Sequence, residues 1–456
     1  MASYQVTNPA TGEVEARYET ASDADIQHAV ETAHQAYLSW RGVAPSERAA
    51  LLHRVADLHE QRSDALADII VREMGKPKSQ ALGELALVVD IYRYYADNGP
   101  AWLEPEPLVT GGAKAEVRKQ GLGVLLGIMP WNFPYYQVAR FAGPNVLNGN
   151  TILLKHAPQC PESALAIEEI FTAAGAPAGV YTNLFASNEQ AGDIIADPRV
   201  QGISLTGSER AGAAVAEQAG RQLKKVVLEL GGSDPFLVLP DADLKQAVKQ
   251  AVQGRFGNCG QACNAAKRII VDDAVFEEFL EAFRQAVEGI QVGDPQAADT
   301  VMGPMSSEQA LVNVDTQVKD AVSQGAKLVT GGQRLDRAGA WYAPTLLTGV
   351  TRDMRIFQEE LFGPVAVVYR AADLDEAIDL ANDTPYGLGA VIQTSNPEGA
   401  LDLANRLEVG MVHINEPPGS EAELPFGGVK RSGFGRELGK DGMEEFVNRQ
   451  MVKMAR

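Results

Sequence analysis

The sequence predicts an α/β fold in which helices cover both faces of a parallel, doubly wound sheet. From Thr151 onward, short apolar runs alternate with helical segments, the order found in βαβ units. The runs are apolar almost throughout, which indicates strands that are buried on both faces. Ligands of such sheets bind outside the carboxyl ends of the strands. The four predicted strands are Thr151–Leu154, Val180–Leu184, Gly202–Thr206 and Lys225–Leu228.

The segments on either side extend this prediction. The first part of the chain is expected to be helical, with a helical run that begins at Ser46 and ends at Gly75. A second α/β region is expected beyond Gly231, because 456 residues suit two or three domains. The Gly/Pro-rich segment Leu103–Gly112 is predicted to form an exposed arm that pairs with the tail after Arg436. In the second region the predicted helices are Ala247–Val252, Phe276–Val287 and Asp375–Leu380, and the predicted strands are Arg268–Val271 and Val365–Tyr369.

Composition disfavours several classes of binding partner. The chain has 40 Lys and Arg against 60 Asp and Glu, a net charge of −20, which disfavours binding to nucleic acid or to an anionic membrane surface. No secretory signal is recognisable, and no stretch approaches the ~18 apolar residues of a membrane span. The cysteines are Cys160, Cys259 and Cys263, too few and odd in number for a disulfide scaffold. A reducing, cytoplasmic location is therefore expected.

Glycine-rich segments give mixed signals about a cofactor. Gly121–Gly127 and Gly433–Gly439 lack the G-x-G-x-x-G spacing and a preceding strand, so both are predicted to be turns. Gly207–Gly212 follows a strand and opens a helix, where free backbone N–H groups could hold a pyrophosphate; an ordinary helix-entry turn is the alternative. None of the six histidines has metal-ligand spacing, and neither H-E-x-x-H nor C-x-x-C occurs. No metal is predicted.

Three residues are candidates for catalysis. Cys263 lies among polar and glycine residues, which favours a loop thiol over a core cysteine. Glu229 ends a predicted strand, where acids and bases of α/β enzymes are found, although a solvated strand end is the alternative. Asn132 stands between two prolines in Pro130–Pro134, which would hold its amide as a fixed donor; a turn residue is the alternative.

Seven motifs follow one another along the chain: Pro130–Pro134, Leu154-Lys155, Thr206–Ser208, Glu229–Gly232, Gly260–Cys263, Glu360–Pro364 and Pro425–Gly428. In this order they resemble the motifs of the aldehyde dehydrogenase superfamily. The resemblance begins at Asn8–Gly12, ends at Ser432–Glu437 and so covers nearly the whole chain. Within the superfamily the chain is most similar to the shorter bacterial succinate semialdehyde dehydrogenases, through Lys155–Pro158 and Gly232–Pro235.

The resemblance implies a domain organisation and a reaction. Residues 1–103 and 122–231 would form a Rossmann-like cofactor domain, residues 232–436 an α/β catalytic domain, and residues 104–121 and 437–456 a small β oligomerisation arm of a homodimer or homotetramer. The implied reaction is NAD(P)-dependent oxidation of succinate semialdehyde to succinate, a step of γ-aminobutyrate degradation. A broad-specificity enzyme for uncharged or longer aldehydes is the alternative. A non-catalytic protein that retains the fold is a third possibility, disfavoured by the intact candidate residues.

By the same resemblance, Cys263 is the nucleophile that attacks the aldehyde. The amide of Asn132 and the N–H of Cys263 would form the oxyanion hole, and hydride loss to a nicotinamide would leave a thioester. Glu229 would then activate the water that releases the acid. Cys259 lies four residues before Cys263, so a reversible disulfide is a hypothesis, with coincidental placement as the alternative.

Cofactor residues also follow from the resemblance. Where many NAD-preferring members carry Glu, whose charge would repel a 2′-phosphate, this chain has Pro158. NADP is therefore expected to be accepted beside NAD, and the preference between them stays open. In the family, Lys155 would contact the adenosine ribose, Gly207, Ser208 and Gly212 would flank the phosphates, Trp131 would line the channel, and Glu360 and Phe362 would hold the nicotinamide ribose and ring.

Substrate choice is expected to depend on Arg140, eight residues after Asn132. Succinate semialdehyde dehydrogenases resemble this chain in having arginine there, and a guanidinium facing the pocket could bind a carboxylate at two points. A surface salt bridge is the alternative. Tyr136 and Ser420 are the other predicted substrate-binding residues. Some of these relatives carry a second arginine where this chain has Gly257, which leaves chain-length selectivity open.

Overall fold

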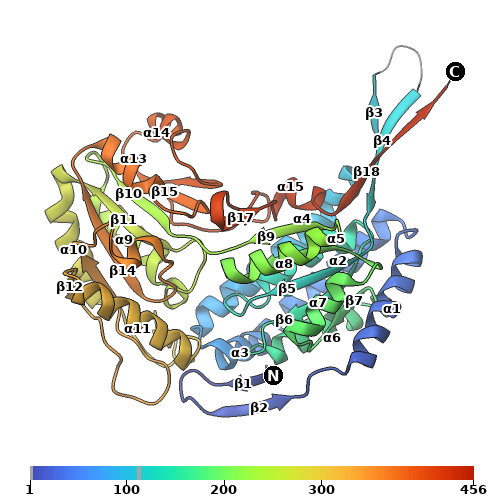
Figure 1. Cartoon of the computed structure of the whole chain (residues 1–456), viewed down its shortest axis with the longest axis horizontal. Coiled ribbons are helices and arrows are strands. Elements are labelled where there is room, and N and C mark those ends of the chain that lie inside the picture. Colours follow the sequence, from blue (N-terminus) through green and yellow to red (C-terminus); the bar gives the residue numbers. More distant parts are fainter. Residues whose placement is uncertain (1–3, 110–113, 456) are drawn as a thin grey trace.

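The computed structural model describes residues 4–109 and 114–455 (Figure 1). It confirms the predicted α/β architecture. A six-stranded sheet has the order β17-β9-β8-β5-β6-β7, with β5 to β9 parallel and β17 antiparallel to β9. All four predicted strands of this region are present, and β5 precedes them. The strands are β5 (Val124–Met129), β6 (Thr151–His156), β7 (Tyr181–Asn183), β8 (Val200–Thr206), β9 (Lys225–Glu229) and β17 (Gly433–Phe434).

Helices surround this sheet and precede it. The predicted helical run is divided at Arg62 into two helices, and the second ends at Gly75, which adopts the left-handed conformation (φ 75°) that favours glycine. Pro77 then precedes the next helix, as its missing N–H allows. The helices are α1 (Asp23–Trp40), α2 (Pro45–Gln61), α3 (Ser63–Met74), α4 (Lys78–Trp102), α5 (Tyr136–Leu147), α6 (Pro161–Ala173), α7 (Asn188–Ala196) and α8 (Glu209–Arg221).

A seven-stranded sheet forms the second α/β region, in the order β12-β13-β14-β11-β10-β15-β16. It is parallel except for β12, and it contains both predicted strands. Its strands are β10 (Asp234–Val238), β11 (Ala266–Asp272), β12 (Lys327–Thr330), β13 (Thr345–Thr348), β14 (Val365–Ala371), β15 (Gly389–Gln393) and β16 (Met411–Ile414). The helices of this region are α9 (Leu244–Phe256), α10 (Phe276–Glu288), α11 (Glu308–Ser323), α12 (Arg355–Gln358), α13 (Leu374–Asn382) and α14 (Pro397–Ala404).

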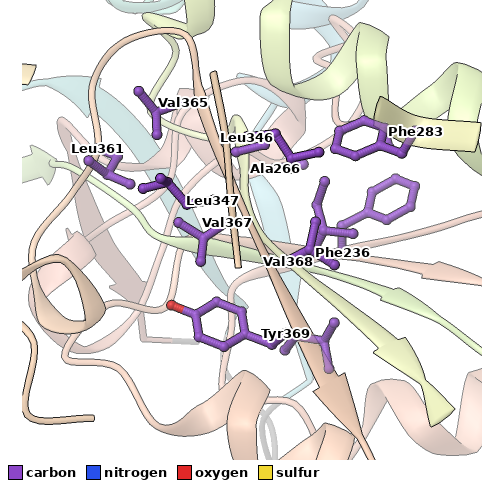
Figure 2. Close-up of a cluster of buried hydrophobic side chains, with 14 of the residues drawn as sticks. Phe236, Ala266, Phe283, Leu346, Leu347, Leu361, Val365, Val367, Val368 and Tyr369 are labelled. Atoms are coloured by element: carbon purple, nitrogen blue, oxygen red, sulfur yellow. The ribbon is translucent and has the colours of Figure 1, made fainter. Parts of the chain in front are cut away.

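The core of this second region lies between the sheet and its helices. Figure 2 shows Phe283 of α10 beside Phe236 and Val368 of the sheet, and the three side chains are almost fully buried. Burying a side chain of this size stabilises the fold by about 1.5–3 kcal/mol. The three predicted helices lie within α9, α10 and α13. The helical spacing of apolar residues in these segments therefore predicted correctly which helix faces are buried.

The predicted arm is a three-stranded antiparallel sheet that projects from the body, with the chain's end at its tip (Figure 1). Its strands are β3 (Glu106–Leu108), β4 (Lys114–Gly121) and β18 (Val447–Met454), and the tail strand β18 pairs with β4 along its whole length. The predicted direct pairing of segment Leu103–Gly112 with the tail is wrong, because β4 lies between β3 and β18. Residues 1–3 of the predicted cofactor domain and 110–113 of the predicted arm lie outside the described residues. A hairpin of β1 (Tyr4–Thr7) and β2 (Val14–Tyr18) begins the described chain, and α15 (Gly439–Glu444) precedes β18.

Two details correct the sequence prediction. Gly121 is the last residue of β4, and Gly433 and Phe434 form β17, so neither glycine-rich segment is simply a turn. β17 pairs with Glu229 and Leu228, which are remote in sequence, and local spacing could not reveal that partner. Among the described residues, no helix is both long and apolar enough to cross a bilayer.

Candidate active site

Two predicted catalytic residues, Asn132 and Glu229, meet Thr206 at the carboxyl ends of the six-stranded sheet. Asn132 follows β5, Thr206 ends β8 and Glu229 ends β9. Parallel neighbouring strands end at one edge, which brings these side chains together. They line a cavity of about 280 Å³, here called the inner cavity. Its lining residues are Pro130, Trp131, Asn132, Gln137, Thr206, Gly207, Ser208, Glu229, Leu230, Gly231, Cys263, Glu360 and Phe362.

Cys263 joins the inner cavity to a second, larger one. The thiol lies in a loop after the short 3₁₀ turn Gly257–Gly260, as predicted, and is partly exposed. It also lines a cavity of about 680 Å³, here called the outer cavity. Cys263 and Gln137 line both cavities. Burial raises the pKa of the Cys263 thiol to about 12, while the Arg140 and Lys267 cations oppose that rise.

The cysteine loop is held by side chains that the sequence analysis did not single out. Asn258 donates from Nδ2 to the carbonyl of Asn132 (2.9 Å), and Asn132 donates from its own Nδ2 to the carbonyl of Gln261 (3.1 Å). Lys267 donates from Nζ to the carbonyl of Cys263 (2.6 Å). One amide hydrogen of Asn132 therefore fixes the loop and the other stays available. Lys267 and Arg268 are consecutive buried cations in β11, and two charges directly before the apolar run Ile269–Val271 were the signal that could have indicated Lys267.

Glu229 is 2% exposed, and neither carboxylate oxygen accepts a hydrogen bond from a described residue. Burial raises the pKa of this carboxyl well above its usual range; the Arg140 cation opposes the rise and the Glu437 carboxyl adds to it. The motif Pro425–Gly428 has glycine at position 427 for a structural reason: a Cβ there would lie 2.6 Å from Glu229 Oε1. The absence of a side chain at Gly427 makes room for the Glu229 carboxyl.

Arg140 is not in the surface salt bridge that was the alternative considered from the sequence. Its side chain is fully buried, so it forms no surface salt bridge, and it does not line the outer cavity. Its Nε forms an ion pair with Glu437, and its Nη2 donates to Thr206 Oγ1 (3.0 Å). The expectation that the guanidinium binds a substrate carboxylate stays a prediction; in this structure the guanidinium contacts the hydroxyl of Tyr136, which lines the outer cavity. The partner Glu437 lay in the motif Ser432–Glu437, but nothing local linked it to Arg140.

Two hydroxyl groups stand between Arg140 and the outer cavity. Arg140 donates from Nη1 to Tyr136 Oη (3.3 Å), and Tyr136 donates in turn to Ser420 Oγ (2.9 Å). Tyr136 and Ser420 both line the outer cavity with Cys263. The structure thus brings two of the three predicted substrate residues to the cavity and places the third behind them.

The predicted cofactor residues lie around the inner cavity and beyond it. Trp131 and Phe362 pack edge to face, with ring centroids 5.7 Å apart. Glu360 pairs with Lys267 (3.0 Å) and accepts from the N–H of Gly232 (3.1 Å). A Cβ on Gly231 would lie 2.2 Å from Glu360 Oε2, so this glycine permits the close approach of the carboxylate.

The helix entry predicted at Gly207–Gly212 is confirmed. Ser208 is the N-cap of α8, and its Oγ accepts from the N–H of Ala211 (3.3 Å). The N–H of Gly207 donates to the carbonyl of Glu229 (2.9 Å), so that group is not free for a ligand. Gly212 packs against Leu230, where a Cβ would come within 2.6 Å of the leucine side chain.

Lys155 lies in β6 with its side chain largely buried, and no described carboxylate forms an ion pair with it. Burial lowers the pKa of its ammonium group. Pro158 follows in the loop, and the next carboxylate, Glu162, is already paired with Arg72. The loop next to Lys155 therefore presents no free negative charge.

All three cysteines are free. Cys259 is buried in the core of the seven-stranded sheet, whereas Cys263 faces the cavities. Burial raises the pKa of Cys259 to about 12. The disulfide hypothesis stays a prediction. Among the described residues, no three His, Cys, Asp or Glu side chains gather as potential metal ligands.

Comparison with known proteins agrees with this geometry. The sequence model of the aldehyde dehydrogenase family matches residues 1–452. A succinate-semialdehyde dehydrogenase (NADP(+)) of Deinococcus radiodurans is 52% identical over 99% of this chain and 94% of its own. The succinate semialdehyde dehydrogenase (NAD(P)+) Sad of Escherichia coli is 45% identical over 98% and 96%. A crystal structure of a Streptococcus pyogenes succinic semialdehyde dehydrogenase with NADP+ superposes with a TM-score of 0.98, at 44% identity over 99% and 100% of the two chains. The chain therefore belongs to the aldehyde dehydrogenase family.

Proposed function

We propose that this protein oxidises succinate semialdehyde to succinate with NADP or NAD as the oxidant. The observation that carries this proposal is the position of Cys263 at the junction of the two cavities, beside Asn132 and Glu229. One cavity can hold the aldehyde and the other the cofactor, so that both meet at the thiol. The named relatives, which are succinate-semialdehyde dehydrogenases, support the same substrate.

The side chains divide the chemistry between them. Cys263 Sγ, as thiolate, forms a bond to the aldehyde carbon, and the carbonyl electrons move to oxygen. That oxyanion takes hydrogen bonds from the second N–H of the Asn132 amide and from the backbone of Cys263. The oxyanion reforms the carbonyl as the carbon loses its hydride to the oxidant NADP or NAD, which would leave a thioester on Cys263. Glu229 removes a proton from the water that attacks this thioester. The bond between carbon and sulfur then breaks, the acid leaves, and the thiolate is restored.

The residues of the inner cavity fit a nicotinamide dinucleotide. When bound, this cofactor would accept the hydride that the substrate carbon loses. Lys155 would contact the adenosine ribose, Ser208 at the start of α8 would adjoin the phosphates, and Glu360 and Phe362 would hold the nicotinamide ribose and ring. The ammonium of Lys155 is without a described carboxylate partner, and Pro158 leaves the loop uncharged, which suits a 2′-phosphate. NADP is proposed to be at least as good a cofactor as NAD.

Carboxylate recognition is proposed to use Tyr136 and Ser420 at the cavity, with Arg140 behind them. Arg140 donates to the Tyr136 hydroxyl, and Tyr136 donates to Ser420, so both hydroxyls are oriented by a buried cation. Hydrogen bonds to an ionised group are worth about 1.5–3 kcal/mol each. Arg140 is a positioning residue in this arrangement, and its charge acts on the substrate through Tyr136.

The proposed organisation is that predicted from the sequence: a cofactor domain of residues 1–103 and 122–231, a catalytic domain of residues 232–436, and an oligomerisation arm of residues 104–121 and 437–456. The exposed three-stranded sheet of β3, β4 and β18 supports the arm's role in a homodimer or homotetramer. A cytoplasmic location and a place in γ-aminobutyrate degradation are also proposed.

The decisive experiment follows NADPH or NADH formation at 340 nm with succinate semialdehyde and with butyraldehyde. We expect higher kcat/KM for succinate semialdehyde, and no activity in Cys263→Ala. Tyr136→Phe should raise KM for succinate semialdehyde about tenfold and leave KM for butyraldehyde within about twofold, because it removes one hydrogen bond to the carboxylate. Equal effects on both substrates would contradict carboxylate recognition by this hydroxyl.

A further inference from the structure

Lys267 is a buried lysine at the start of β11, directly behind the cysteine loop. Its side chain is 1% exposed, and its ammonium group has one acceptor for each of its three hydrogens. The acceptors are the carbonyls of Ala262 (2.9 Å) and Cys263 (2.6 Å) and the carboxylate of Glu360 (3.0 Å). Any role of Lys267 in the reaction therefore passes through these three partners.

The two carbonyls belong to the peptide groups on either side of the Cys263 Cα. A peptide group is planar, and in its usual trans form the N–H points away from the C=O. The carbonyl of Ala262 and the N–H of Cys263 are parts of one such group, so the cation at this carbonyl fixes the direction of the N–H and polarises it. This N–H is the backbone donor that the proposed function assigns to the oxyanion hole.

The third partner, Glu360, lies on the cofactor side of the site. Its carboxylate lines the inner cavity, and the proposed function assigns it to the nicotinamide ribose. A carboxylate that is largely removed from water requires a counter-ion to stay ionised at low cost. Among the described residues, Lys267 is the one cation that pairs with Glu360. One ammonium group thus contacts both the backbone of the nucleophile and the carboxylate on the cofactor side.

Arg255 ties the same two loops together at another point. It is fully buried, and its guanidinium donates to the carbonyl of Gly260 (3.1 Å) in the cysteine loop and to that of Leu361 (2.9 Å), next to Glu360. These contacts remain when the ammonium group of Lys267 is removed. A Lys267 variant is therefore expected to keep both loops folded, which makes the role of Lys267 open to measurement.

We infer that Lys267 is a positioning residue, which holds the oxyanion-hole N–H of Cys263 and the carboxylate of Glu360 in one fixed arrangement. The inference rests on the proposed function for its chemistry: the thiolate forms a bond to the aldehyde carbon, and NADP or NAD accepts the hydride that the same carbon loses. Because both events occur at one carbon atom, a shift of the N–H relative to the carboxylate slows oxidation. A misplacement of about 1 Å can lower a rate about a hundredfold.

The test compares two reactions of Cys263 in the full-length Lys267→Met variant, whose new side chain is similar in length and uncharged. Alkylation by iodoacetamide, followed by mass spectrometry without cofactor, requires only the thiolate. Oxidation of succinate semialdehyde with NADP requires the thiolate, the oxyanion hole and the cofactor. Both should become slower, because the Lys267 cation lowers the pKa of the thiol. The value of kcat/KM for oxidation should fall at least about tenfold more than the rate constant of alkylation, so the ratio of the two isolates the positioning effect.

Lys224→Met is the matched control. The ammonium group of Lys224 also donates to two backbone carbonyls, those of Ile195 and Asp197 (both 2.5 Å), but it lies just before β9 and lines neither cavity. In this variant the ratio of oxidation to alkylation should equal that of the wild type.

A second background tests the link through Glu360. Glu360→Gln keeps the shape of the side chain and removes its charge, so the ion pair with Lys267 is already absent. In this background Lys267→Met should lower the ratio of oxidation to alkylation by a smaller factor than in the wild type, as expected for two residues that act as a pair.

The outcomes separate this inference from the proposed function. If the wild type oxidises succinate semialdehyde and Lys267→Met leaves the ratio unchanged, the inference is overturned and the proposed function stands, since a general disturbance of the cysteine loop affects both reactions of the thiol alike. An equal fall of the ratio in Lys224→Met, or an equal fall in the two backgrounds, would also overturn it. If the wild type oxidises no aldehyde with either cofactor while iodoacetamide still labels Cys263, the proposed function fails, and the inference with it.

Discussion

Replacing Arg140 by leucine should destabilise the protein strongly, independently of any substrate. Arg140 is fully buried and is the ion-pair partner of Glu437, which is 4% exposed. Removing one member of a buried pair typically costs about 3–5 kcal/mol, because the other charge stays buried without a counter-ion. Thr206 and Tyr136 would also lose the hydrogen bonds that Arg140 donates. A free energy change of this size would reduce the ratio of folded to unfolded protein at least a hundredfold.

A second substitution separates the charge effect from lost packing. In Arg140→Leu/Glu437→Gln, the unpaired charge is gone and residue 437 can still accept from Ser204 Oγ, which now donates to the carboxylate over 3.1 Å. We expect the double variant to recover at least half of the lost stability. The free energy of unfolding of the single and the double variant is measured by urea denaturation, followed by tryptophan fluorescence at one protein concentration. An unchanged midpoint in Arg140→Leu, or a double variant less stable than the single one, would refute the reasoning.

The stability of the Arg140→Leu variant should also depend on pH. Burial already raises the pKa of the Glu437 carboxyl, and the Arg140 cation opposes that rise. Without Arg140, the carboxyl of the folded protein would bind a proton more readily than in the unfolded chain. Stability would then fall as pH rises through the interval between the two pKa values. The loss in Arg140→Leu should therefore be smaller at pH 6 than at pH 9, and an opposite trend would exclude Glu437 as its cause.

Three further predictions concern the cofactor, stability and the nucleophile. Pro158→Glu should lower the ratio of kcat/KM for NADP to that for NAD at least tenfold through repulsion of the 2′-phosphate; an unchanged ratio in steady-state kinetics would place the phosphate elsewhere. Burial raises the pKa of Asp234 to about 8, above the ~3.9 of an unfolded chain, so the free energy of unfolding should fall as pH rises from about 4 to 8. In Asp234→Asn, thermal unfolding should show a smaller decrease in stability over the same pH range. The pKa of about 12 for Cys263 implies that iodoacetamide labels it about tenfold faster per pH unit from 7 to 9, with Cys263→Ala as control; a flat rate would show a thiolate already formed.

Local patterns in the sequence were sufficient for much of the fold. The strands of the six-stranded sheet could be predicted from short apolar runs, because a strand that is covered on both faces has no polar side. The helices α9, α10 and α13 showed the 3.6-residue spacing of their buried faces. Motif order indicated Cys263, Glu229 and Asn132, which the structure brings to one pair of cavities. Their catalytic roles stay predictions that kinetics must test.

What the sequence by itself determined is the set of elements and the chemically reactive residues, since both depend on residues that are neighbours along the chain. The tertiary structure alone decided the partner of each buried charge. The sequence suggested that Arg140 contacts the substrate. In the structure, Glu437, which is far away in the sequence, forms an ion pair with Arg140 behind Tyr136. A buried charge requires a counter-ion wherever the fold supplies one, and local spacing carries no record of such long-range pairs.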